Sequence, residues 1–255
     1  MKKTLKYILI CFFIIVLAVN VAGCSFSEPD LTFKEKEHLF NKYGKDAAYM
    51  GGDDGIYLNY HLSNNIQVDF YIDTDMAGEL QTAARSAISK ANEISGNFTI
   101  TANGEKDSAY KFTIAELTGD NANAGAIASS KIQSGYIIET TIYYNSLTIE
   151  PYMQYAYSLE DISLHELGHF FGLADINYAA ESETDRKNLE IFSLMHKQRQ
   201  HIKDHSPLCF VLPSVKFWCV CKFDVNFTEF DTANILWRYD ADKFYAMYPY
   251  GFVPK

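Results

Sequence analysis

The sequence predicts an α/β (α+β) fold in which helices pack on a mixed β-sheet, and three features predict it. Residues 66–72 alternate apolar and polar side chains and are rich in β-forming residues, which is typical of a half-buried strand. Residues 76–95 place apolar side chains at the spacing of one helical face, and residues 73–75 before them offer N-cap oxygens. Further strand candidates follow at 98–101, 110–117 and 140–144. One strand, a long helix and then several strands indicate a mixed sheet with a helix packed on it.

Length and composition are those of an ordinary globular protein. The chain has 255 residues, of which 48% are hydrophobic and 21% are charged. A chain of this length suits one large domain, or two subdomains that share a cleft.

The first 24 residues resemble the signal segment of a bacterial lipoprotein. Lys2, Lys3 and Lys6 precede an apolar run over residues 7–19, and the run leads to Val21-Ala22-Gly23-Cys24. Small residues before a cysteine resemble the lipobox. This resemblance implies that Cys24 carries lipid, and that it anchors the protein to the cell membrane or outer membrane, facing the periplasm or exterior. The alternatives are an uncleaved signal anchor, or ordinary cleavage without a lipid.

The chain that remains after such cleavage is strongly acidic. Residues 1–23 hold three of the 22 Lys and Arg and none of the 32 Asp and Glu, which leaves 19 basic against 32 acidic residues, a net charge of −13. Such a surface repels phosphate backbones, so no nucleic-acid partner is expected. It does not attract anionic lipid either, so the acyl chains on Cys24 would have to hold the protein at the membrane.

Three cysteines remain outside the signal segment, at 209, 219 and 221. Export permits disulfides, and an odd number leaves at least one thiol free or paired between molecules. The last two lie in a period-two stripe of apolar residues over 215–227, which predicts a half-buried strand.

A helix expected to begin at Ser158, with Asp161 as the partner in a capping box, contains His165-Glu166-Leu167-Gly168-His169. Residues four apart lie on one helical face, so both imidazoles can reach one metal ion, and neutral imidazole suits zinc. Glu166 is placed to reach a water molecule on the ion rather than the ion itself.

The motif continues beyond the helix. Gly172 follows His169 by three residues, and Asp175 follows Gly172 by three. Gly172 can adopt the left-handed conformation that ends a helix, and the turn would return Asp175 to the metal.

These residues resemble the metzincins, the metallopeptidase clan whose pattern is His-Glu-x-x-His-x-x-Gly-x-x followed by a third ligand, usually His. An aspartate at that position, here Asp175, resembles the snapalysin-like branch. Met195 fits the structural Met-turn of the clan. Residues 227–236 resemble the C-terminal helix of matrixin-like domains, and residues 140–145 are a candidate for the edge strand that binds substrate there.

The resemblance implies a metzincin-like zincin, with a mixed twisted sheet and packed helices above the active-site helix and a small subdomain below the cleft. The expected organisation is a signal peptide (1–23), a tether and entry segment (24–63), an N-terminal catalytic subdomain (64–172) and a C-terminal catalytic subdomain (173–255). The implied activity is that of a zinc-dependent endopeptidase that cleaves proteins or peptides outside the cytoplasm. His165, His169 and Asp175 would hold one zinc ion, and Glu166 would act as the general base.

Two other interpretations stay open at this point. A lipoprotein adhesin or binding module could hold zinc on the same fold without catalysis. A zinc peptidase of another clan would take a more distant third ligand, for which Glu181 and Glu183 are the nearest candidates. Residues 120–123 lack the full pattern of a calcium loop, so they are expected to form a plain turn.

Overall fold

The structure is a computed structural model of the chain. It describes residues 32–43, 57–94, 96–150, 156–175, 184–185, 188, 195 and 226–247. All of these belong to one compact unit formed by residues 31–201 and 225–255. Several predictions fall outside the described residues: the lipobox with Cys24, the three later cysteines, the stripe over 215–225, and Glu181 and Glu183. None of the described helices is long and apolar enough to cross a membrane.

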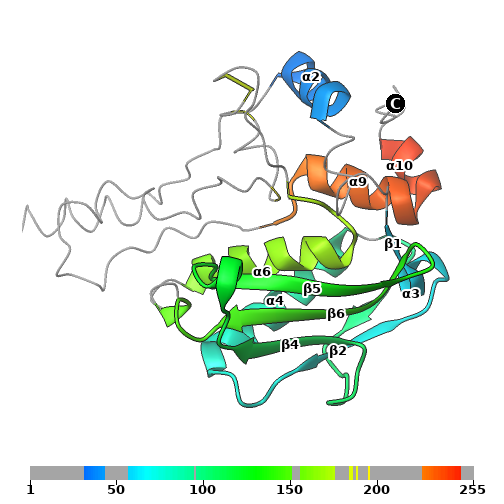
Figure 1. Cartoon of the computed structure of the whole chain (residues 1–255). Coiled ribbons are helices and arrows are strands. Elements are labelled where there is room, and N and C mark those ends of the chain that lie inside the picture. Colours follow the sequence, from blue (N-terminus) through cyan, green and yellow to red (C-terminus); the bar gives the residue numbers. More distant parts are fainter. Residues whose placement is uncertain are drawn as a thin grey trace, which may run out of the picture. The chain divides into compact units, whose positions relative to one another are not determined.

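The described strands form one mixed sheet, as the sequence predicts (Figure 1). The strands are β1 (Leu58–Asn59), β2 (Val68–Ile72), β3 (Ile100–Thr101), β4 (Tyr110–Ala115), β5 (Ala126–Gln133) and β6 (Tyr136–Asn145). Parallel pairs join β1 to β6, β6 to β4, β4 to β2 and β2 to β3. Only β5 runs antiparallel, beside β6.

The described helices are α2 (Phe33–Tyr43), α3 (Tyr60–Ser63), α4 (Gly78–Glu93), α6 (Ala156–Phe170), α9 (Glu229–Tyr239) and α10 (Ala241–Met247), with a 3₁₀ turn η3 (Gly119–Asn121). The predicted helix over 76–95 is therefore present, two residues shorter at each end. The predicted C-terminal helix is also present as α9. It begins with a capping box in which Thr228 and Asp231 bond to each other's backbone N–H.

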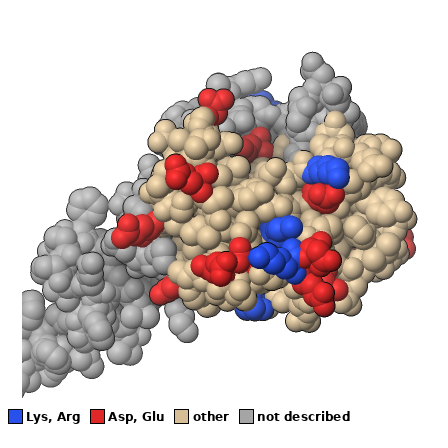
Figure 2. All heavy atoms as spheres, turned by 60° about the horizontal axis from the view of Figure 1, so that its bottom comes forward, with Lys and Arg blue, Asp and Glu red and all other residues tan. Residues whose placement is uncertain are grey.

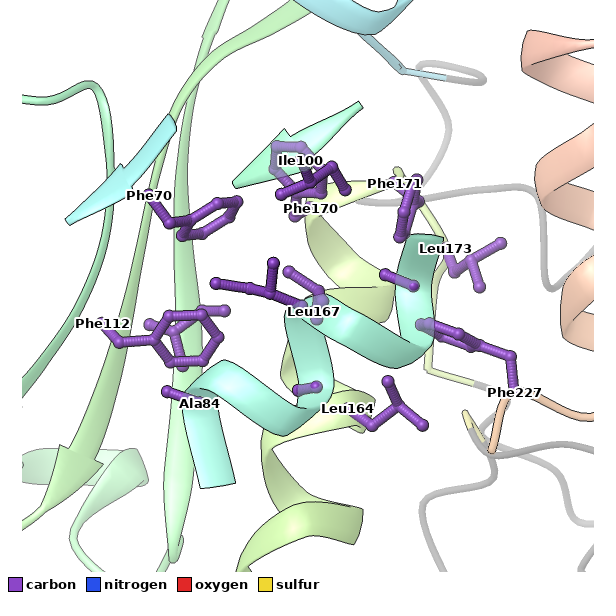
Figure 3. Packing of buried hydrophobic residues seen from close by; sticks show 14 of the residues in the cluster. Phe70, Ala84, Ile100, Phe112, Leu164, Leu167, Phe170, Phe171, Leu173 and Phe227 are labelled. Atoms are coloured by element: carbon purple, nitrogen blue, oxygen red, sulfur yellow. The ribbon is translucent and has the colours of Figure 1, made fainter. Parts of the chain in front are cut away.

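The hydrophobic core lies between the sheet and the helices α4 and α6 (Figure 3). Phe70 of β2 and Phe112 of β4 face Ala84 of α4 and Leu167 of α6, and all four residues are fully buried. Full burial of one such large side chain contributes about 1.5–3 kcal/mol. The rings of Phe70 and Phe170 lie 5.0 Å apart, so the last turn of α6 is packed directly on the sheet. This packing fixes the helix that carries the His-Glu-x-x-His motif.

The edge of the sheet differs from the prediction. Residues 140–145 belong to β6, which is an interior strand, because β5 pairs along its length on one side and β4 and β1 occupy the other. The edge strand is β5, which pairs only with β6 among the described residues (Figure 1). The sequence did not predict β5, because its second half is exposed and polar and lacks a period-two pattern. Ser134 and Gly135, with φ of 53° and 80°, form the tight turn that joins it to β6.

Two predicted helix caps are wrong. The N-cap of α4 is Ala77, which makes no side-chain cap bond, whereas the Asp73 carboxylate accepts hydrogen bonds from Thr113 Oγ1 and from the N–H of Asp75. Asp73 therefore ties the end of β2 to β4. Helix α6 begins at Ala156, so Ser158 lies inside the helix and cannot cap it.

Candidate metal centre

Helix α6 presents both histidines of the motif on one face. The side chains of His165 and His169 are 12% and 15% exposed, and their rings lie 5.2 Å apart at an angle of 89°. The opposite face of the helix is buried in the core, because Leu164 and Leu167 are fully covered. The helix therefore has only one face on which polar groups can meet a ligand, and the histidines lie on it.

A Schellman motif ends the helix. The N–H of Leu173 bonds to the carbonyl of Gly168, and the N–H of Gly172 bonds to the carbonyl of His169. Gly172 has a φ of 81°, as the turn requires. Its backbone also touches the chain that enters β1, since a Cβ on Gly172 would lie 2.2 Å from the carbonyl oxygen of Tyr57. Two independent constraints thus demand glycine at this position.

The turn brings Asp175 back to the histidines. Its Oδ1 lies 3.2 Å from Nε2 of His165 and 3.6 Å from Nε2 of His169. Tetrahedral zinc, bound at about 2.0–2.1 Å, separates its ligand atoms by about 3.3–3.4 Å. The donor set and its spacing therefore fit one zinc ion. Among the described residues, no other group of three His, Cys, Asp or Glu side chains converges in this way.

The same turn also orients one of the imidazoles. Nδ1 of His169 lies 2.8 Å from the carbonyl oxygen of Leu173. A carbonyl only accepts hydrogen bonds, so Nδ1 carries the proton and Nε2 keeps its lone pair toward Asp175. This is the tautomer that a metal ligand needs.

Glu166 lies beside the triad without belonging to it. Its residue is only 7% exposed, and it lines a cavity of about 550 Å³ together with His165, His169 and Asp175. No hydrogen bond or ion pair holds the Glu166 carboxylate among the described residues. The neighbouring Tyr144 of β6 is fully buried and bonds to Ser163 of α6 at 2.6 Å. Burial, and to a smaller extent the charge of Glu166, raises the pKa of Tyr144, so this phenol stays neutral.

Met195 packs directly against the motif helix. It is fully buried, and a Cβ on Gly168 would lie 2.3 Å from its sulfur. Glycine at 168 therefore leaves the space that the methionine fills. The sequence singled out Met195 through the resemblance alone, and gave no reason to expect that Gly168 was needed for the contact.

A buried polar network at the end of α6 was not predicted. The hydroxyl of Tyr239 in α9 donates to the carbonyl of Phe171 at 2.9 Å and accepts from the N–H of Asn59 at 2.8 Å. Burial raises the pKa of Tyr239 to about 12, so the hydroxyl keeps its proton. Asn59 also donates from its side chain to the carbonyl of Phe170 at 3.5 Å. These bonds hold the turn that leads to Asp175.

Residues of η3 and of the first half of β5 form a second part of the described cavity wall. Asn145 fixes the backbone of this part, because its side chain donates to the carbonyls of Ala122 and Ala124 at 3.0 Å each. The hydroxyl of Thr148 adds a third bond, to the carbonyl of Ala124 at 2.5 Å. Asp120, Asn121 and Asn123 of this wall line the cavity. They form the turn that the sequence predicts, and its contact with the cavity was not foreseen.

Comparisons with known proteins add little to this geometry. No family model matches the chain, and no curated protein matches it in sequence. Among solved structures, the chain is similar to high choriolytic enzyme 1, a hatching enzyme zinc-protease from the medaka fish Oryzias latipes. That match has a TM-score of 0.37 and 14% identity, and covers 76% of this chain and 98% of the other.

Proposed function

We propose that the chain is a zinc-dependent endopeptidase of the metzincin type, with His165, His169 and Asp175 as the zinc ligands. The observation that carries this proposal is the convergence of two imidazole nitrogens and one carboxylate oxygen, all within 4.8 Å of one another, with the oxygen 3.2 and 3.6 Å from the nitrogens. A zinc ion held there would polarise a substrate carbonyl and make a water molecule a better nucleophile at neutral pH.

Glu166 is the proton carrier in this proposal. It follows His165 in the sequence and lines the same cavity, so it can take a proton from the attacking water and deliver it to the leaving amine. Burial raises the pKa of Tyr144, so its neutral phenol does not compete as a base. A buried carboxylate without a partner costs free energy, and functional sites are where such groups are often found.

Edge strand β5 would orient the substrate. Its outer backbone groups are unpaired among the described strands, and Ala124 to Ala128 line the cavity. An extended peptide can pair with such an edge, which would place its scissile bond near the histidines.

The alternative function is that of a binding module that holds zinc but catalyses no reaction. The position of Glu166 argues against it, because a purely structural zinc site needs no buried carboxylate beside the ligands. Anchoring through lipid on Cys24, and export from the cytoplasm, are part of the same proposal and rest on the lipobox-like sequence.

The test uses residues 25–255 loaded with zinc, and measures cleavage of casein and zinc content by elemental analysis. Glu166→Gln should keep about one zinc per chain and lose nearly all turnover, because it removes the base and leaves the ligands. Glu105→Gln, an exposed site in a loop outside the cavity lining, is the matched control and should remain active. Wild-type activity in Glu166→Gln, or active protein without zinc, would contradict the proposal.

A further inference from the structure

The part of the cavity wall formed by η3 and β5 carries a carboxylate to which the proposed mechanism assigns no role. Asp120 lies in η3, is exposed, and lines the cavity. It forms no ion pair or hydrogen bond with another described residue. In the proposed mechanism His165, His169 and Asp175 bind the metal and Glu166 transfers the proton. Asp120 has neither role, so it can interact with a substrate.

The wall holds Asp120 in place. Besides the three bonds from Asn145 and Thr148, Oδ1 of Asn145 accepts from the N–H of Leu117 at 3.3 Å, and the Asn145 N–H donates to Gly125 at 2.9 Å. Asn145 is fully buried, so these bonds are shielded from water. The backbone on both sides of Asp120 is therefore fixed to the end of β6, and its carboxylate is presented from a rigid support.

The surrounding chain is almost free of positive charge. Between residues 112 and 175 the only Lys or Arg is Lys131, and its ammonium is paired with Glu139 at 2.8 Å. The same stretch contains eight acidic residues: Glu116, Asp120, Glu139, Glu150, Glu160, Asp161, Glu166 and Asp175. Figure 2 shows one face of the molecule, on which acidic side chains are spread over the described surface and basic ones lie near acidic ones. No unpaired Lys or Arg of this stretch therefore opposes the negative charge of Asp120.

The wall also leaves room for a long side chain. Four of the five residues of β5 and its entry that line the cavity are small, Ala124, Gly125, Ala126 and Ala128, and the fifth is Ile127. Among the described residues that line the cavity there is no Lys or Arg. A substrate side chain can pass along this wall and reach Asp120 without meeting a like charge.

We propose that this site prefers substrates with Lys or Arg next to the scissile bond, and that Asp120 is the residue that selects for them. The proposal rests on the endopeptidase function proposed above and names its substrate class. An exposed ion pair changes binding by about 1.5- to fivefold, so a preference of this size is expected from Asp120 alone.

The experiment compares zinc-loaded protein on fluorogenic peptides that are identical except for one residue. Lys, Gln or Glu is placed in turn at each position flanking the bond, and kcat/KM is measured for each peptide. Wild type should prefer Lys over Gln at one position at least. Asp120→Asn should lower this Lys/Gln ratio by about 1.5- to fivefold, and Asp120→Lys should favour Glu instead. Added salt should weaken the wild-type preference, since an exposed pair is screened.

Asp107→Asn removes the same charge from an exposed loop residue outside the cavity lining, and should leave the ratio unchanged. A second arm measures peptide binding to the Glu166→Gln variant by fluorescence anisotropy, so charge preference is read without turnover. No Lys preference in wild type, or a preference that Asp120→Asn leaves intact, overturns the proposal. Absence of cleavage on every peptide is instead a failure of the proposed function, and the binding arm then still decides the role of Asp120.

Discussion

Replacing Gly172 with alanine should damage the metal site through the backbone alone. Two effects oppose alanine at this position. The backbone has a φ of 81°, and the new Cβ would lie 2.2 Å from the carbonyl oxygen of Tyr57. The left-handed conformation costs a non-glycine residue about 1–2 kcal/mol. The clash is with backbone that cannot rotate away, and overpacking of this kind adds about 1–3 kcal/mol. We expect a total loss of about 2–5 kcal/mol in the free energy of unfolding.

Gly135 supplies a matched control. Its φ of 80° is nearly the same, but a Cβ there would meet nothing within 4 Å. Gly135→Ala should therefore cost only the conformational part, about 1–2 kcal/mol. Comparing the two variants separates the cost of the left-handed backbone conformation from the cost of the steric clash with Tyr57.

Two assays complete the test. Urea unfolding of the metal-free proteins gives the stability loss, and competition with a chromophoric chelator gives the zinc affinity. The turn that Gly172 makes carries Asp175, so Gly172→Ala should weaken zinc binding by about 10- to 100-fold, as when groups that orient a ligand are lost. Gly135→Ala should leave it unchanged. Equal stability losses in the two variants, or native zinc affinity in Gly172→Ala, would refute this account of the turn.

Two further predictions concern the third ligand and its support. Asp175→Ala should lose zinc affinity by a large factor, whereas Asp175→His should retain metal, because a catalytic zinc site needs three protein ligands. Competition with a chelator measures the affinity of both variants. Unchanged affinity in Asp175→Ala would show that Asp175 is not a zinc ligand. Tyr239→Phe deletes the hydroxyl that bonds to Phe171 and should weaken zinc binding more than Tyr110→Phe. The hydroxyl of Tyr110 contacts Asn59 and His61 and, among the described residues, bonds neither to α6 nor to the turn after it. If both phenylalanine variants bind zinc equally well at equal stability, the hydroxyl of Tyr239 supports only the fold.

The sequence predicted the parts of the site that depend on local geometry. Helical periodicity alone places His165 and His169 on one face, and a glycine three residues later marks the turn. The distances from Asp175 to both imidazoles agree with that expectation. Strand β2 and helix α4 are likewise encoded in short patterns.

The unpredicted parts depend on contacts between distant segments. The bond from Asn59 to Tyr239 spans 180 residues, and the bond from Tyr239 to Phe171 spans 68. No local pattern marks either residue, because a buried tyrosine and a capping asparagine are common in any fold. Strand β5 was not predicted for a related reason. Its extended conformation depends on pairing with β6, and its exposed half lacks an alternation of apolar and polar residues. Ser134 and Gly135 were the one local signal of this hairpin.

The charges of the proposed site explain why Asp120 rather than the motif should set the substrate preference. A zinc ion brings two positive charges, and the carboxylates of Asp175 and Glu166 balance them within the cavity. The motif is therefore close to neutral once metal is bound, and it offers a substrate side chain little net attraction. Asp120 has no such partner among the described residues, so its charge is the one that a nearby substrate cation would meet.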